Sequence, residues 1–334
     1  MVRATHRGIA HEAAELEKRC PGRRPHAWLD GVTPLHLDEV AIDEDLVRQL
    51  VDSQFPEWSG LRLTPASGGT DNRMLRLGDD LVVRLPRKPS AAAAVAKEHR
   101  WLPQLAPHLP LRVPEPCALG RPGDGYPFPW SVYRWIDGAE LDPEHVMDEA
   151  TLGRDVARFV GALHGIDLMD ARREGPLSSY RGGSLRSLSG WTAENLEACR
   201  GLKDLDLDLA ALGSMWQQAL DVEEPKVPHT WMHTDLKPSN LLQRQGALVG
   251  VIDFGGLSVG DPTAEHAPTW DLPSAARHAY ADELHLDTST RLRARAWALG
   301  VALSGVPYYW STWPDFVQEC LRRLRRILSD PDDV

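Results

Sequence analysis

The sequence predicts an α+β protein of two lobes: a small β-sheet lobe with one packed helix, then a larger and mostly helical lobe. Alternating apolar and polar runs dominate as far as residue 136, and apolar residues at helical spacing dominate after Pro143. Two short strand patterns then flank a charged loop within residues 231–254. A change of hydrophobic period from two to about 3.6 residues distinguishes sheet from helix. We therefore divide the chain into an N-terminal extension (1–40), a first lobe (41–136) and a second lobe (137–334).

The first lobe begins with a helix pattern, because Leu46, Val47, Leu50 and Val51 recur at helical spacing. Two alternating runs around Gly78-Asp79-Asp80 then predict an antiparallel hairpin. In chain order, the predicted elements are a helix at 43–54, a short strand near 61–63, hairpin strands at 73–77 and 81–85, a helix at 91–105 and a strand at 130–136.

The second lobe is predicted to be mainly helical, at residues 152–164, 191–199, 207–220 and 273–328. The basic stretch at 322–326 is expected to be a solvent-exposed helix face. Strand patterns at 231–242 and 248–254 flank the charged loop, and Gln245-Gly246 supplies a turn that would pair their inner ends.

Composition limits the class of protein. The net charge is −11, from 48 acidic and 37 basic residues, which argues against a nucleic-acid partner. No run approaches the roughly 20 apolar residues of a membrane span, and the first residues lack the apolar core of a signal peptide. The four cysteines are far apart and form no C-x-x-C pair. We expect a cytoplasmic protein without a membrane or an evident obligate protein partner, whose extension forms a helix around residues 11–18.

The charged loop and the strand after it carry the residues expected to do chemistry. They match H-x-D-x-x-x-x-N from His233 to Asn240, followed by D-F-G from Asp253. Transfer of a phosphoryl group needs a carboxylate beside the attacking hydroxyl, and an amide oxygen and a second carboxylate around Mg²⁺. We therefore assign Asp235 to the hydroxyl and its proton, and Asn240 and Asp253 to Mg²⁺. His233 is expected to brace the loop, and Lys237 either contacts the transferring phosphate or faces solvent.

These motifs resemble the aminoglycoside phosphotransferase family, which is related to choline and macrolide kinases. The family carries H-G-D-x-x-x-x-N, then I-D-F-G or I-D-W, then G-D-P and an acidic residue. This chain has the loop ending at Asn240, Ile252-Asp253-Phe254-Gly255, and a Gly260-Asp261-Pro262 run followed by Glu265. The resemblance covers roughly residues 43–313 and implies a protein-kinase-like fold with ATP or GTP and Mg²⁺. Thr234 replaces the usual glycine, Lys237 an often-seen histidine, and Glu265 an aspartate.

The resemblance also implies a nucleotide site in the first lobe. Its glycine turn either approaches the phosphates or is an ordinary hairpin turn. Arg84 stands where kinases usually have a phosphate-binding lysine, with Glu98 as its partner. Residues 131–135 are expected to link the lobes and to bind the base through backbone groups. The predicted nucleotide-binding residues are Gly68, Gly69, Thr70, Asn72, Arg84, Glu98, Tyr133 and Trp135.

Acidic residues after the metal loop are candidates for the acceptor site. Asp261, Glu265 and Asp271 would attract a polycationic sugar, although each also has a structural interpretation. Trp270 is a candidate pocket wall or, as aromatic residues more often are, part of the core. The acceptor class predicted from these residues is an antibiotic or related natural product.

Three alternatives remain open at this point. A metabolic kinase for an amino alcohol or a sugar would use the same chemistry. A nucleotide-binding module without transferase activity is suggested only by Arg84 in place of lysine. A protein kinase is disfavoured because G-x-G-x-x-G-x-V, V-A-I-K and A-P-E are absent from the sequence and the segment from Gly255 to Ala267 is short.

Overall fold

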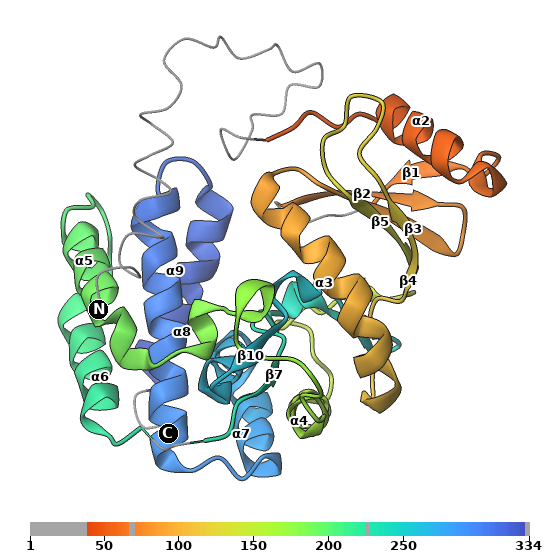
Figure 1. Cartoon of the computed structure of the whole chain (residues 1–334). Coiled ribbons are helices and arrows are strands. Elements are labelled where there is room, and N and C mark those ends of the chain that lie inside the picture. Colours follow the sequence, from red (N-terminus) through yellow and green to blue (C-terminus); the bar gives the residue numbers. More distant parts are fainter. Residues whose placement is uncertain (1–38, 67–70, 225–226, 331–334) are drawn as a thin grey trace. The chain divides into compact units, whose positions relative to one another are not determined.

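The computed structural model describes residues 39–66, 71–224 and 227–330. The helix expected around residues 11–18 and the turn with Gly68, Gly69 and Thr70 lie outside the described residues. Both lobes belong to one unit, Asp38–Val334. Figure 1 shows the sheet lobe in orange and yellow and the helical lobe in green and blue, so the predicted α+β order is confirmed.

The first lobe contains a five-stranded antiparallel sheet with the strand order β1-β2-β3-β5-β4. Its elements are α2 (Glu44–Gln54), β1 (Leu63–Pro65), β2 (Asn72–Leu77), β3 (Leu81–Pro86), α3 (Pro89–Leu105), β4 (Pro116–Gly120) and β5 (Trp130–Arg134). The predicted hairpin is confirmed, because β2 and β3 pair from Leu77 and Leu81 across a turn that begins at Gly78, where φ is 61°.

Strand β3 is buried along its whole length because helices cover both faces of the sheet. Val83 shares an apolar cluster with Val47 of α2, and Val82 shares another with Trp101 of α3. Alternate residues of a strand face opposite sides of a sheet. Arg84, two residues after Val82, therefore points toward α3.

Strand β4 is an addition to the predicted elements, because the alternation at residues 116–120 is too weak to indicate a strand. It forms by pairing with β5. The approach is close at Gly120, where a Cβ atom would lie 2.0 Å from the Trp130 ring. Glycine at this position lets the two strands pair over a buried tryptophan.

The helices of the second lobe are α4 (Glu149–Gly165), α5 (Ser189–Arg200), α6 (Leu209–Asp221), α7 (Ser274–Glu283), α8 (Thr288–Tyr309) and α9 (Pro314–Ser329). The helical segment predicted at 273–328 is divided into three, and Asp287 caps α8 by accepting from the backbone N–H of Thr290 at 2.6 Å. Helix α8 is buried around most of its circumference because α5, α6 and α9 pack against it.

Five short strands frame the charged loop: β6 (Ala139–Glu140), β7 (Thr230–Met232), β8 (Leu241–Arg244), β9 (Ala247–Val251) and β10 (Ser258–Gly260). β8 and β9 form the predicted hairpin. Gln245 and Gly246 have φ values of 54° and 81°, as a type I′ turn requires. β7 ends at Met232, so residues 233–240 leave the sheet as the charged loop. None of the helices that the structure describes is long and apolar enough to cross a membrane.

Candidate active site

The charged loop between β7 and β8 is held by its histidine. His233 is fully buried, and its Nε2 lies 2.9 Å from the Ile252 carbonyl oxygen. Its Nδ1 accepts a hydrogen bond from the backbone N–H of Asp235 at 3.2 Å. Burial lowers the pKa of His233, so the imidazole is neutral and can donate at one nitrogen and accept at the other. This placement agrees with a bracing role for His233.

Glu265 also holds the charged loop in place, through its carboxylate. Its carboxylate accepts from the backbone N–H groups of His233, at 3.1 Å, and Thr234, at 2.8 Å. Burial raises the pKa of Glu265 to about 7 despite these two bonds. Both oxygens are therefore used inside the protein, where only 1% of the residue is exposed.

Thr234 has a conformation that a β-branched residue rarely adopts. Its φ is 72°, in the left-handed region. The N–H bond to Glu265 and a bond from Oγ1 to the Gly256 carbonyl oxygen, at 3.0 Å, hold it there. Gly256 is required in turn, because a Cβ atom on it would lie 2.3 Å from Thr234 Oγ1. The loop thus keeps the shape that the family's usual glycine adopts freely, with these contacts offsetting the strain.

Asp235 is surrounded by donors. Arg181 Nη1 lies 3.2 Å from its Oδ1, and Asn240 Nδ2 donates to its Oδ2 at 3.1 Å. Lys237 Nζ lies 3.8 Å from Oδ2. Burial pushes the pKa of Asp235 upward, but Arg181 and then Lys237 outweigh burial and hold the pKa below its ordinary value. Asp235 is therefore ionised and fixed in orientation at neutral pH.

Asn240 and Asp253 are brought together by the β8–β9 hairpin. Leu241 pairs with Val251, and the backbone N–H of Ile252 donates to the Asn240 carbonyl oxygen at 2.9 Å. Asn240 uses its amide nitrogen on Asp235, which leaves the amide oxygen for another partner. Asp253 follows directly with a φ of 62° and a side chain that is 42% exposed.

These oxygens fit a magnesium ion. Mg²⁺ is usually bound by one or two carboxylates together with substrate phosphates and water, and it prefers oxygen ligands. Among the residues that the structure describes, no cluster of three or more His, Cys, Asp and Glu side chains is arranged to hold a metal. The donor set of Asn240 and Asp253 suits an ion that arrives with a nucleotide.

Arg84 connects the two lobes. Its Nη1 donates to both carboxylate oxygens of Glu98, at 2.8 and 2.9 Å, and its Nη2 donates to Asp253 Oδ1 at 2.9 Å. In the amide orientation that satisfies both groups, Asn72 accepts from Arg84 Nε at 3.2 Å and from Nη2 at 3.0 Å. Burial lowers the pKa of Arg84, but Glu98 and Asp253 outweigh it and raise the pKa above its ordinary value. The structure thus brings Asn72, Arg84, Glu98 and Asp253 into one network.

The segment predicted to bind the base, residues 131–135, lies mostly in strand β5. The backbone of β5 is used by β3 on one side and β4 on the other, and the N–H of Trp135 donates to the Asp80 carbonyl oxygen at 2.7 Å. Tyr133 is buried with its hydroxyl on Glu98, and the Trp135 indole N–H donates to Asp137 at 2.8 Å. Most of the segment 131–135 is therefore part of strand β5, and residues 135–138 connect β5 to β6.

Lys97 is a site residue that sequence reasoning missed. Its Nζ donates to the carbonyl oxygens of Gly255 and Leu257, both at 2.8 Å, so α3 holds the loop after Asp253. Burial lowers the pKa of Lys97 to about 8, while Glu98 partly restores it. No pattern in the sequence marked Lys97, because consecutive residues of a helix point about 100° apart.

The acidic residues proposed for the acceptor have internal partners. Asp261 Oδ1 accepts from the backbone N–H of Thr263 at 2.9 Å, which is its structural role. Glu265 holds the charged loop, as described above. Asp271 forms a two-point ion pair with Arg323, whose Nε lies 2.7 Å from its Oδ1. Each of these three candidates for the acceptor site thus accepts a hydrogen bond from a donor of the protein itself.

Trp270 is also corrected, because it belongs to the core. Only 3% of it is exposed, and it packs in the cluster around α8 and α9. The basic stretch 322–326 is only partly solvent-facing: Arg323 turns toward Asp271, and Arg326 donates to the Leu272 carbonyl oxygen at 2.9 Å. These contacts attach α9 to the 3-10 helix η8 (Pro262–Asp271).

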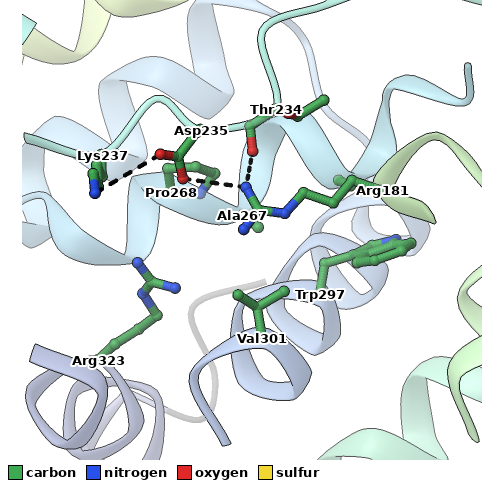
Figure 2. A pocket seen from close by; sticks show the side chains of 10 residues that line it. Arg181, Thr234, Asp235, Lys237, Ala267, Pro268, Trp297, Val301 and Arg323 are labelled. Carbon is green, nitrogen blue, oxygen red and sulfur yellow. Dashed lines mark hydrogen bonds and ion pairs between the residues drawn. The ribbon is translucent and has the colours of Figure 1, made fainter. Parts of the chain in front are cut away.

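A small cavity of about 20 Å³ adjoins Asp235, and Figure 2 shows its walls. Arg181 comes from the short helix η4 (Tyr180–Gly182) and Arg323 from α9. Both face this cavity, and sequence reasoning assigned neither to the site. The signal for Arg181 was the Gly182-Gly183 pair after it, since Gly182 packs closely on Gly260. The residues that line the cavity are Arg181, Thr234, Asp235, Lys237, Ala264, Ala267, Pro268, Trp297, Val301 and Arg323.

A comparison with protein-family models identifies the chain. Residues 62–298, more than half of its length, match the model described as the phosphotransferase enzyme family. The chain belongs to this family. It is accordingly a phosphotransferase, and the resemblance inferred from the motifs is confirmed. A search of the curated proteins gave no significant match.

Solved structures support the fold of this phosphotransferase. One is the GDP complex of wild-type aminoglycoside 2′-phosphotransferase-IIIa, with 18% identity, a TM-score of 0.69, and coverage of 87% of this chain and 100% of that one. Another is the apoenzyme of the macrolide 2′-phosphotransferase MphH from Brachybacterium faecium, with 22% identity, a TM-score of 0.58, and coverage of 84% and 98%. The streptomycin–ATP–APH(2″)-IIa ternary complex has 18% identity, a TM-score of 0.57, and coverage of 87% and 97%. The phosphotransferase therefore has the kinase-like fold that was predicted.

Proposed function

We propose that the protein transfers the γ-phosphoryl group of ATP or GTP to a hydroxyl of a small molecule of antibiotic or natural-product type. The observation that carries this proposal is that Asn240 bonds Asp235 and pairs through its carbonyl oxygen with Ile252, the residue before Asp253. Similar solved structures are complexes with GDP or ATP, and with kanamycin or streptomycin. The cytoplasm supplies the nucleotide, and it is the location that we propose.

Asp235 would accept a hydrogen bond from the acceptor hydroxyl and take its proton as the phosphoryl group arrives. Its lowered pKa makes it a weak base, so its main contribution is to orient the hydroxyl in line with the phosphate. This suits phosphoryl transfer, in which positioning and charge stabilisation provide most of the rate enhancement. Lys237, beside Asp235, supplies a positive charge to the transferring group.

The nucleotide side uses Asn240, Asp253 and Arg84. Asn240 and Asp253 would hold a Mg²⁺ ion, which neutralises charge on the phosphates when bound. Arg84 is positioned by Glu98 and Asp253 and offers a cation to phosphate oxygens. Glu98 and Tyr133 act only through Arg84, because both are buried.

The test is a mass-spectrometric screen of hydroxyl-containing antibiotics for gain of one phosphoryl group, with nucleotide and Mg²⁺. Release of nucleoside diphosphate by the same protein is followed against Mg²⁺ concentration. Asp253→Ala should raise the Mg²⁺ concentration required, and Asp79→Ala, on an exposed turn, is the control. An unchanged Mg²⁺ dependence in Asp253→Ala would remove Asp253 from the metal site, and absence of nucleotide turnover with every acceptor would contradict the proposal.

A further inference from the structure

The wall of the cavity beside Asp235 is cationic, whereas the sequence had suggested an acidic one. Three of its residues, Arg181, Lys237 and Arg323, are positively charged, and Asp235 is the one carboxylate among its lining residues. The acidic side chains expected to face an amine lie elsewhere: Glu265 is buried under the charged loop. A ligand placed here therefore meets more positive than negative charge.

We propose that the acceptor carries a small anionic group beside its reactive hydroxyl, and that Arg323 binds this group in the cavity. This inference rests on the proposed phosphotransferase function.

Among the described side chains that line the cavity, cations outnumber carboxylates by three to one. Arg181 pairs with Asp235 at 3.2 Å, and Arg323 pairs with Asp271. Lys237 is the third cation, and the carboxylate nearest to it, 3.8 Å away, already pairs with Arg181. The side chains of Arg181 and Arg323 are only 22% and 18% exposed, so water screens them incompletely. A small anion from the ligand would be attracted by Arg181 and Arg323, whereas a polycation would be repelled by them.

Arg323 has the geometry of an anion ligand. Asp271 occupies its Nε and Nη2 atoms, which fixes the plane of the guanidinium. In Figure 2 the guanidinium of Arg323 extends from α9 toward the space below Asp235 and Lys237. An arginine fixed by one carboxylate can bind a second anion at little further entropic cost, because its side chain is already ordered.

The size of the cavity also favours a small group. Its volume of about 20 Å³ is slightly more than the roughly 10–15 Å³ that one water molecule needs. Trp297 and Val301 of α8 and Ala267 of η8 close its apolar side. The cavity thus has room for a single small polar group beside Asp235. The reactive hydroxyl would then lie outside this cavity, on the Asp235 side.

The experiment compares matched acceptors. D-Glycerate, its uncharged amide, ethanolamine and kanamycin are tested for phosphoryl gain, and D-glycerate binding is measured by saturation-transfer NMR. We expect turnover or binding with D-glycerate to exceed that with its amide by at least about tenfold. Arg323→Ala should raise the KM or Kd for D-glycerate by about tenfold and leave the nucleotide KM unchanged. These tenfold changes correspond to the loss of one charged hydrogen bond.

Two further variants keep this test decisive. Arg322→Ala removes the same charge from the exposed side of α9 and should behave as wild type. Arg323→Lys keeps a cation next to Asp271 and should restore part of the binding if Arg323→Ala is poorly folded. An Arg323 role in packing alone would leave the acid-to-amide ratio unchanged in these variants.

The failure of this inference is distinguishable from failure of the proposed function. Phosphorylation of kanamycin or ethanolamine in preference to D-glycerate would contradict the anionic-acceptor proposal and would still support the phosphotransferase function. Equal binding of D-glycerate and its amide would also overturn it, whether or not turnover is seen. Loss of nucleotide binding and turnover with every acceptor would contradict the proposed function instead.

Discussion

The two carboxylates of the site are each paired with an arginine, but the arginines come from different lobes. Asp235 pairs with Arg181, which belongs to the same lobe. Asp253 pairs with Arg84, which comes from β3 of the first lobe. The acceptor-side carboxylate is thus held within one lobe, whereas the nucleotide-side carboxylate is held across the two.

This difference matches what each carboxylate is proposed to do. Asp235 must keep one orientation toward a hydroxyl, and Arg181 is itself fixed on the Thr234 carbonyl oxygen. Asp253 must be free to exchange its arginine for an ion that enters with the phosphates. A pair between lobes can be exchanged when a nucleotide enters, because its two partners lie on separate elements. The predictions below test this contrast, from the largest expected effect to the smallest.

The largest effect is expected at Asp235. Asp235→Ala should lower kcat by at least about 10²-fold, the usual scale for a lost acid–base group. The nucleotide KM should change little, because Asp235 lies on the acceptor side. Steady-state kinetics checks this, with Asp235→Asn as the isosteric control that keeps the shape but not the charge. Turnover near the wild-type rate would remove Asp235 from its proposed role.

A smaller effect is expected at Arg84. Arg84→Lys keeps the positive charge but cannot bond Glu98 and Asp253 at once, so the nucleotide KM should rise by about 10- to 100-fold through the loss of one charged hydrogen bond. Acceptor KM should be unaffected. Arg84→Ala is expected to unfold more readily as well, because Glu98 is 1% exposed and would lose its cationic partner. Equal nucleotide KM values in the wild type, Arg84→Lys and Arg84→Ala would show that the Arg84–Asp253 pair does not serve the nucleotide.

At Arg181 we expect a shift in pH dependence. Arg181 lowers the pKa of Asp235, so Arg181→Leu should raise that pKa toward and above its ordinary value. The acidic limb of the kcat/KM profile should then move to higher pH, because the carboxylate becomes protonated at higher pH. Arg181→Lys should reverse most of the shift. If the acidic limb of Arg181→Leu lay at the same pH as that of the wild type, Arg181 would not control the pKa of Asp235.

The smallest effect on activity is expected at Glu265. Its substitution is expected to change the free energy of unfolding instead. The folded-state pKa of about 7 lies above the ordinary value of 4.5, so the protonated form favours folding, and this contribution is lost as pH rises from about 4.5 to about 7. The free energy of unfolding of Glu265→Gln relative to wild type should therefore increase between pH 5 and pH 8, by about 1–3 kcal/mol. Denaturant titrations at both pH values check this. A difference independent of pH would mean that Glu265 stays ionised, held by its two N–H donors.

Much of the fold was predictable because it rests on local patterns. Leu46 to Val51 specify a helix, and Gly78 and Gly246 specify the turns of two hairpins, through preferences that act within a few residues. The hairpin at Gly246 also brings Asn240 beside Ile252, the residue before Asp253. Strand β4 was not predictable, because its pairing with β5 and the fit of Gly120 under Trp130 depend on distant residues.

The charge of the acceptor site was the main point on which sequence reasoning was wrong. Asp261, Glu265 and Asp271 lie close together in the chain and suggested an acidic wall. In the structure they cap a helix, hold the charged loop and pair with Arg323. A sequence does not show which carboxylates are used internally, because their partners lie up to 52 residues away, as for Asp271 and Arg323.

The sequence by itself determined the chemistry: the order of a carboxylate, an amide and a second carboxylate on one loop and one hairpin, and hence the family. Only the tertiary structure decided which charges face the acceptor, because Arg181 and Arg323 reach the same cavity from η4 and α9, on either side of the charged loop in the chain. The backbone hydrogen bonds of a hairpin join residues that are near in the chain, so the turn and strand residue types are enough to predict them. The field inside a cavity is a sum over all charges near it, and it exists only after the chain has folded.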